Sequence, residues 1–252
     1  MTDFLSKINQ LDAKLNIESV HQQVVEINNI VATIKQKQVL KKAPKKLGFL
    51  PDIAEEICSN HFHSKDQLDD FKTINQLLNN TRQFLAIKFG LWSIPNLETA
   101  QTIKDQLKIY KGLEIMAGNG YWSKALSQVG VKMTATDNLD WSRTSNTGAQ
   151  AFVSVGNYDA VTAVKQFNDV DLIICSWAPN FGNSDEKVVA TWQKFNSAKH
   201  LLFVGERNGV TNSVAFWQKE SFLHTKKLKL INQIFTSFDF IDEQIFEIAH
   251  EI

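Results

Sequence analysis

Two acids flank a short glycine turn near the middle of the chain. Glu114 lies four residues before Gly118, and Asp137 lies seventeen residues after Gly120. Glycines allow a ligand to approach the backbone closely. An acid that ends the following strand can accept hydrogen bonds from both ribose hydroxyls of a bound nucleoside. This spacing therefore predicts a nucleoside cofactor site.

The residues around the turn favour one of two nucleoside cofactors. A dinucleotide-binding turn rests its pyrophosphate on a helix N-terminus and has a third glycine where this chain has Ser123. The bulky Tyr121 and Trp122 directly after Gly120 make such a phosphate-binding turn less suitable. S-adenosylmethionine has no phosphate and carries a positive sulfonium and an ammonium, so it suits the acid Glu114. The pattern favours S-adenosylmethionine and leaves NAD(P) as the alternative.

The elements that must position these residues alternate after residue 90. Short runs rich in β-branched residues, typical of strands, lie near 112–117, 131–136, 151–155, 170–176 and 199–205. Helical segments lie between most of them, near 121–129, 158–167 and 184–197. Strands that alternate with helices predict a parallel sheet covered on both faces. The glycine turn would then lie at the carboxyl end of a strand, where open α/β sheets bind ligands.

Two stretches depart from this alternation. Between Asp137 and Ala151 the residues are polar and rich in Gly, Ser, Thr and Asn, so we expect a loop where a helix would normally lie. Two apolar runs near 228–238 and 243–250 end the sequence. We interpret them as a closing antiparallel pair of strands.

Residues 1–90 have a helical pattern of their own. Apolar residues recur every three or four positions from Leu5 to Leu15 and from Val20 to Ile34, as on one face of a helix. Ser64 is a good N-cap for a third helix. We therefore predict an N-terminal helical region over 1–90 and a cofactor-binding domain over 91–252.

Six lysines lie between Lys35 and Lys46, with no acid among them. Pro44 interrupts the helical pattern there, because proline lacks the helical donor. The segment is either a solvated linker or a contact for nucleic acid or another anionic partner.

Four segments in order resemble motifs of the class I S-adenosylmethionine-dependent methyltransferases. Glu114–Gly120 is similar to the first motif, with Met116 where the family pattern has its first glycine. Asp137 matches the ribose-binding acid, and Asn157–Ala160 resembles the segment that contacts the adenine. Asp171–Pro179 resembles the fourth strand and its loop beside the transferable methyl. The resemblance implies a Rossmann-like three-layer α/β sandwich with a mostly parallel sheet and an antiparallel C-terminal strand pair.

The resemblance covers roughly residues 90–252 and also implies the residues of the site. Trp92 and Pro95 belong to a W-S-I-P segment similar to ones that can lie over the cofactor in some members of the family. Asp159 would accept a hydrogen bond from the adenine amino group. The residues expected to bind S-adenosylmethionine are Trp92, Pro95, Glu114, Ala117, Gly118, Asn119, Gly120, Trp122, Asp137, Asn138, Tyr158, Asp159, Ala160, Ser176, Trp177 and Pro179.

Two further polar residues are candidates for catalysis on the acceptor side. Glu206 ends an apolar run and is the candidate general base, and Asn180 follows the fourth predicted strand. A base is needed only when the acceptor must lose a proton. The segment Ser176–Asn180 keeps only a serine and one proline of the motif found in relatives that methylate nucleic-acid amino groups. The acceptor therefore stays open among a small molecule, a protein and a nucleic acid, and so does the oligomeric state.

The composition excludes several classes of protein. The 27 basic and 27 acidic side chains give a net charge of zero, which argues against a general polycation that coats nucleic acid. Two cysteines, Cys58 and Cys175, do not make a disulfide scaffold. No apolar stretch approaches the roughly 20 residues of a membrane span, and the first residues lack the order of a signal peptide. We expect a cytoplasmic protein without a membrane partner and without a metal site, since His61 and His63 have no third ligand nearby.

Three functions fit these patterns. The leading one is an S-adenosylmethionine-dependent methyltransferase. The second is an NAD(P)-dependent oxidoreductase that uses the same glycines and Asp137. The third is a non-catalytic methyltransferase-like module that keeps the fold and holds a partner through its helices and lysines.

Overall fold

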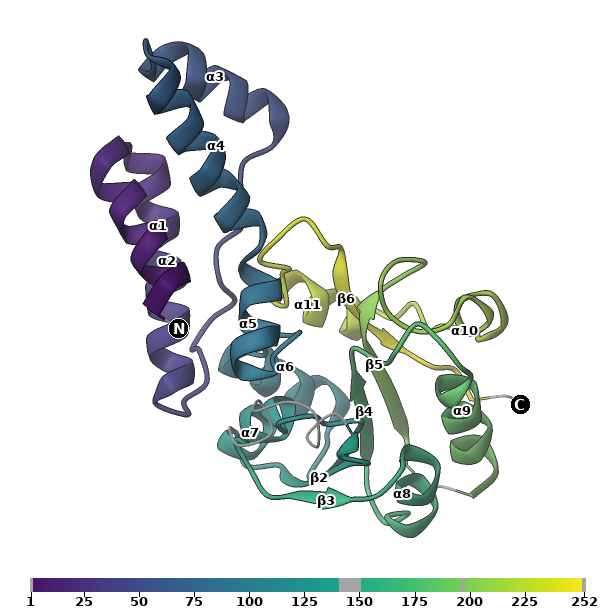
Figure 1. The fold of residues 1–252 in the computed structure, drawn as a ribbon. Coiled ribbons are helices and arrows are strands. Elements are labelled where there is room, and N and C mark those ends of the chain that lie inside the picture. Colours follow the sequence, from purple (N-terminus) through teal and green to yellow (C-terminus); the bar gives the residue numbers. More distant parts are fainter. Residues whose placement is uncertain (1, 141–150, 196–197, 251–252) are drawn as a thin grey trace.

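The fold is built on one sheet of six strands (Figure 1). The structure is a computed structural model that describes residues 2–140, 151–195 and 198–250. The strands lie in the order β3-β2-β1-β4-β5-β6. Their bounds are β1 (Lys111–Ile115), β2 (Lys132–Asp137), β3 (Val155–Asn157), β4 (Leu172–Ser176), β5 (His200–Glu206) and β6 (Glu243–Glu247). The first five strands are parallel and β6 runs antiparallel to β5, which confirms the predicted sheet.

Helices cover both faces of this sheet and form the N-terminal region. In the N-terminal region their bounds are α1 (Thr2–Leu15), α2 (Glu18–Lys35), α3 (Pro51–His61), α4 (Lys65–Asn79) and α5 (Thr81–Phe89). Around the sheet they are α6 (Leu97–Leu107), α7 (Tyr121–Gln128), α8 (Ala160–Gln166), α9 (Ser184–Phe195), α10 (Val214–Lys219) and α11 (Lys226–Ile234).

Buried side chains of the central strands alternate between the two faces. On β4, Leu172 and Ile174 join the core that contains side chains of α6, α7 and α11. Ile173 and Cys175 join the second core, with side chains of α8, α9 and α10. Successive side chains of a strand point to opposite faces, so a strand buried on both sides has a continuous apolar sequence. The three-layer arrangement is therefore the predicted one.

The N-terminal helices pack beside the sheet region. Figure 1 shows α1, α2 and α4 side by side, with α5 between them and the helices of the sheet. The Ser64 hydroxyl accepts a hydrogen bond from the backbone N–H of Gln67 and caps α4, as predicted. Ile74 and Leu78 of α4 belong to the same buried core as Ile103 of α6 and Ala125 of α7. The division at residue 90 stays a prediction, and one continuous core crosses it.

The strand predicted over 151–155 lies later in the chain. Pairing with β2 begins at Val155, which is in register with Ala135. The preceding residues instead cover the glycine turn: the Phe152 ring lies 4.3 Å from that of Tyr121, and Val153 fills the space beside Gly120. This apolar run is buried by packing on the turn, so its composition resembles that of a strand. Most of the loop predicted between Asp137 and Ala151 lies outside the described residues.

The prediction of a strand near 228–238 is wrong. Most of that run is the helix α11, whose first turn is capped by Thr225. Its buried residues Leu228 and Ile231 are three positions apart, which places them on one helical face. The antiparallel strand pair at the end of the chain is formed by β5 and β6.

The six lysines of the segment from Lys35 to Lys46 are all exposed to solvent. The side chains of Lys37 and Lys46 contact other parts of the chain: the Lys37 ammonium donates to the carbonyl of Ala151, and the Lys46 ammonium lies over the ring of Phe240. Among the described helices, none is long and apolar enough to cross a membrane.

Candidate functional site

A cavity of about 850 Å³ opens at the carboxyl ends of β1, β2 and β4. Of the residues predicted to bind the cofactor, all but Gly120 and Pro95 line it. They are Trp92, Glu114, Ala117, Gly118, Asn119, Trp122, Asp137, Asn138, Tyr158, Asp159, Ala160, Ser176, Trp177 and Pro179. The tertiary structure therefore brings together segments that are up to 87 residues apart (92 to 179) in one hollow.

The turn after β1 has left-handed backbone at three positions. Met116, Gly118 and Gly120 have φ of +50°, +53° and +69°. Met116 thus keeps a conformation that favours glycine, at the position where the family pattern has one. A Cβ on Gly118 would meet no atom within 4 Å, whereas a Cβ on Gly120 would lie 2.5 Å from Val153. Gly118 leaves room for a ligand, and Gly120 leaves room for the packing of the protein itself.

Glu114 is a buried acid of β1 whose carboxylate meets the first turn of α7. Its carboxylate accepts a hydrogen bond of 2.6 Å from the backbone N–H of Ser123, in the first turn of that helix. Burial raises the pKa of Glu114 to about 7. Among the described residues, no salt bridge links Glu114 to a cation. The carboxylate therefore favours the approach of a positively charged ligand group.

Asp137 joins the end of β2 to the glycine turn. One carboxylate oxygen accepts from the backbone N–H of Gly118 at 2.9 Å, and the other accepts from Leu139 at 2.8 Å. Each carboxylate oxygen has two lone pairs and can accept more than one hydrogen bond. Asp137 is thus placed to orient the turn and to bind a diol at once.

Asn119 offers a buried acceptor in the cavity. Its side-chain N–H donates to the carbonyl of Phe89, and its backbone carbonyl accepts from Phe152. The side-chain oxygen of Asn119 has no hydrogen-bond partner among the described residues. Buried polar atoms are nearly always paired, so this oxygen is an unsatisfied acceptor beside the cavity.

Tyr158 and Asp159 form the wall next to β3. The backbone N–H of Tyr158 donates to the carbonyl of Asp137, and its ring packs edge-on against Phe167. The Asp159 side chain caps α8 by accepting from the N–H of Thr162, and this hydrogen bond lowers the pKa of Asp159. The acid is exposed, so it lines the cavity as a carboxylate while it caps the helix.

Two stacked tryptophans close the end of the cavity beyond β4. The rings of Trp92 and Trp177 lie 5.2 Å apart at 19°. Trp177 has φ of +55°, which is unusual for a bulky residue, and its indole N–H donates to Glu243. Trp92 is 49% exposed. Backbone strain of this kind is concentrated at functional sites.

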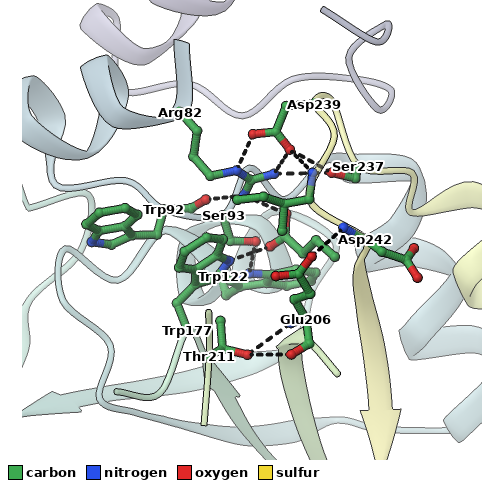
Figure 2. Close-up of polar contacts among 12 residues, drawn as sticks. Arg82, Trp92, Ser93, Trp122, Trp177, Glu206, Thr211, Ser237, Asp239 and Asp242 are labelled. Atoms are coloured by element: carbon green, nitrogen blue, oxygen red, sulfur yellow. Dashed lines mark hydrogen bonds and ion pairs between the residues drawn. The ribbon is translucent and has the colours of Figure 1, made fainter. Parts of the chain in front are cut away.

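Arg82 of α5 holds this pair from behind (Figure 2). Its guanidinium donates to the carbonyl of Trp92, to Asp239 at 2.6 and 2.9 Å, and to Glu243 at 2.8 Å. It also lies over the ring of Trp177, at 4.9 Å from the centroid. Sequence reasoning missed this arginine, because its acidic partners Asp239 and Glu243 lie more than 150 positions away.

The two candidate catalytic residues do not line the cavity. Asn180 is exposed on the loop after β4, and Glu206 ends β5. The Glu206 carboxylate accepts from the backbone N–H groups of Val210 at 3.1 Å and Asp242 at 3.2 Å (Figure 2). These contacts fit a side chain that joins two loops.

Other lining residues were not predicted. Ser93 lines the cavity and accepts a hydrogen bond from the indole N–H of Trp122. It lies in the W-S-I-P segment, so the predicted residues Trp92 and Pro95 on either side of it could have indicated it. Ser184 and Lys187 come from α9. No local motif marks them, because only the placement of α9 next to β4 brings them to the cavity.

Comparisons with known proteins add similar folds. No family model matches the chain, and no curated protein matches it. Among solved structures, the N-methyltransferase NodS from Bradyrhizobium japonicum, in complex with S-adenosyl-L-homocysteine, is 14% identical, with 60% of this chain and 86% of that one covered and a TM-score of 0.37. A ribosomal protein L11 methylase from Lactobacillus delbrueckii subsp. bulgaricus is 16% identical over 65% and 83%, with a TM-score of 0.37. Human N-acetylserotonin methyltransferase, in complex with SAM, is 10% identical over 79% and 60%, with a TM-score of 0.40. Likeness at this level does not decide the function.

Proposed function

We propose that this protein is an S-adenosylmethionine-dependent methyltransferase. The observation that carries the proposal is the position of Glu114. Its buried carboxylate accepts from the first turn of α7, where a dinucleotide would rest its pyrophosphate. A phosphate there would meet a carboxylate, whereas an ammonium would be attracted to it.

The charges of the cavity support the same ligand. Its described lining has three acids, Glu114, Asp137 and Asp159, against one cation, Lys187. A cationic nucleoside without phosphate suits this balance better than a dinucleotide does. The open space at Gly118 and the unpaired oxygen of Asn119 also fit such a ligand, because they offer close backbone approach and an acceptor for its ammonium.

Different residues would then bind different parts of the ligand. Asp137 would hold the ribose hydroxyls, and Tyr158 and Asp159 would hold the adenine. Glu114 and the Asn119 oxygen would hold the ammonium of the methionine part. When bound, S-adenosylmethionine supplies an electrophilic methyl group and its own leaving group. The chain's task is to align an acceptor with that methyl and to exclude water, for which Trp92 and Trp177 are placed.

Calorimetric titration with S-adenosylhomocysteine tests this proposal. We expect the wild-type protein to bind it, and Asp137→Ala to weaken binding by at least about tenfold, since a charge-assisted hydrogen bond contributes about 1.5–3 kcal/mol. Asp105→Ala is the matched control, because Asp105 is an exposed acid on α6 away from the cavity. It should bind like the wild type.

NADH is the competing ligand in the same experiment. Binding of NADH with no heat from S-adenosylhomocysteine would replace the proposal with an oxidoreductase. Equal losses in Asp137→Ala and Asp105→Ala would show that Asp137 does not contact the ligand.

A further inference from the structure

A second cavity, of about 350 Å³, adjoins the first. Trp92 and Trp177 line both cavities, so the stacked indoles form a shared wall between them. The first cavity holds the predicted cofactor residues, whereas the second is lined from α5 and from the loops beside β5 and β6. The second cavity therefore lies next to the part of the first cavity that Trp92 and Trp177 border.

The second cavity gathers apolar side chains that water reaches. Trp92, Val210 and Phe240 are 49%, 47% and 43% exposed, and Ile241 lies between Phe240 and β6. Exposed apolar groups that meet in one hollow mark a binding site more often than scattered ones do. Two of the three are aromatic, and aromatic faces favour the stacking of another flat ring.

The charged groups in the lining are already paired. Arg82 and Asp239 both line the second cavity, and the guanidinium donates to both carboxylate oxygens of Asp239. Burial alone would lower the pKa of Arg82, but the carboxylates of Glu243 and Asp239 outweigh it and raise the pKa. The surroundings of the guanidinium are thus acidic overall, which disfavours an anionic ligand.

Hydrogen bonds hold the walls of the second cavity in place. Glu206 accepts from the backbone of Val210 on one wall and from that of Asp242, next to Ile241, on the other. Arg82 holds the backbone carbonyl of Trp92 (Figure 2). A rigid hollow binds a rigid ligand at a lower entropy cost than a flexible one.

We propose that the second cavity binds a flat, uncharged aromatic or heteroaromatic ring of a small-molecule methyl acceptor. The stacked Trp92–Trp177 pair and Phe240 would contact its faces. This inference rests on the proposed function, because the ring counts as an acceptor only if the first cavity holds S-adenosylmethionine. A small molecule is favoured over a nucleic acid, since the two carboxylates that share the single cation Arg82 leave a net negative charge beside the cavity, which disfavours a chain of phosphates.

Three matched probes test the class of ligand. The protein is saturated with S-adenosylhomocysteine and titrated by calorimetry with 2-naphthol, with its saturated counterpart 2-decalol and with the anionic 2-naphthoate. We expect 2-naphthol to bind at least about tenfold more tightly than either of the others, because stacking needs a flat ring and the described lining of the pocket has no unpaired cation. Equal binding of 2-decalol would overturn the flat-ring class. Tighter binding of 2-naphthoate would overturn the uncharged class and point to Lys46, which lies over Phe240.

Variants locate the probe. Phe240→Ala should weaken 2-naphthol binding about tenfold and leave S-adenosylhomocysteine binding unchanged, because Phe240 lines only the second cavity. Val210→Ala, on a different loop, should act in the same direction. Phe181→Ala is the control: Phe181 is 78% exposed and lines neither cavity. An equal loss in Phe181→Ala would overturn the assignment to this cavity.

Two further outcomes separate the possible failures. Displacement of 2-naphthol by a single-stranded RNA of twenty adenosines would overturn the small-molecule assignment. If S-adenosylhomocysteine does not bind, the proposed function fails, and the same 2-naphthol titrations in the free protein still decide whether the second cavity takes a flat ring.

Discussion

The two cavities meet at one pair of tryptophans but are built in different ways. Most of the first is lined by short segments at the ends of β1, β2 and β4 and by the residues that follow them. The second joins Arg82 of α5 to Asp239 near the other end of the chain, 157 positions later. A site made of strand ends can be predicted from local sequence, because the strands bring their ends together. A site made of distant segments depends on the packing of the whole molecule.

The buried acids of the two cavities also have different partners, backbone groups in the first and a distant cation in the second. Glu114 in the first has backbone hydrogen bonds, and its pKa is raised by burial. The acids behind the second, Asp239 and Glu243, share the guanidinium of Arg82. The first cavity therefore keeps an acid that destabilises the ligand-free fold at neutral pH, and the second keeps its acids in a network that holds the fold together. Three sets of variants test this contrast.

The largest effect is expected at Arg82. Arg82→Met would leave two buried carboxylates without their cation, so the free energy of unfolding should fall by about 3–5 kcal/mol. Arg82→Lys keeps the charge but loses the planar fork of donors. Its free energy of unfolding should lie between those of the wild type and Arg82→Met. Urea unfolding followed by tryptophan fluorescence measures both changes.

Lys72→Met is the matched control, since Lys72 is an exposed basic residue of α4. It should change the stability by less than about 0.5 kcal/mol. A loss in Arg82→Met below about 1 kcal/mol would show that the network does not hold the second cavity together.

The next effect is the pH dependence of Glu114. Its pKa rises from 4.5 to about 7 on folding, which corresponds to about 3 kcal/mol at about 1.4 kcal/mol per unit. A raised pKa gives stability that is fully present below pH 4.5 and is lost as the pH rises toward 7. Relative to the wild type, Glu114→Gln should therefore gain stability between pH 4.5 and 7, by up to about 3 kcal/mol at pH 8.

Urea unfolding of the wild type and of Glu114→Gln at pH 5, 6, 7 and 8 checks this expectation. S-adenosylhomocysteine binding at pH 7 gives a second readout: the wild type should release protons on binding, and Glu114→Gln should not. A stability difference that stays constant with pH would contradict the burial of an ionisable Glu114.

The smallest effect compares the two glycines of the turn. Gly120→Ala should lower stability by about 2 kcal/mol, because its Cβ would meet Val153 in addition to the left-handed strain. Gly118→Ala should cost only about 1 kcal/mol, because its Cβ points into open space. Affinity for S-adenosylhomocysteine should show the reverse order, with the larger loss, about tenfold, in Gly118→Ala.

Unfolding curves of the same two variants give the order of their stabilities, and calorimetry gives the order of their affinities for S-adenosylhomocysteine. If Gly120→Ala loses the more affinity, the division between a ligand glycine and a packing glycine is wrong.

The fold could be predicted where burial leaves a local pattern. The apolar run of β4 and the cap Ser64 could both be seen in the sequence, because each depends on neighbours within a few positions. The assignment of β3 over 151–155 was wrong for a tertiary reason, since those residues are buried against the glycine turn. The strand predicted near 228–238 was wrong because an apolar run was interpreted as a strand, although Leu228 and Ile231 have the three-residue spacing of one helical face.

In the candidate site, too, local sequence predicted some residues and tertiary packing decided others. Motif residues from Trp92 to Pro179 line one cavity as the order of the segments suggests. Glu206 was singled out because it ends a strand, yet its contacts with Val210 and Asp242 join two loops. No pattern in the sequence distinguishes a carboxylate that points into a cavity from one that accepts from nearby backbone.

The sequence by itself determined the alternating elements, the glycine turn and the acids around it, because strand burial and turn geometry restrict residue types over short distances. Only the tertiary structure decided that Arg82 meets Asp239 and Glu243, that Trp92 stacks on Trp177, and that a second cavity opens beside the first. Such contacts join segments that lie far apart in the sequence. They form when the N-terminal helices and the C-terminal strand pack on the same sheet, and packing of that kind leaves no periodic trace in the sequence.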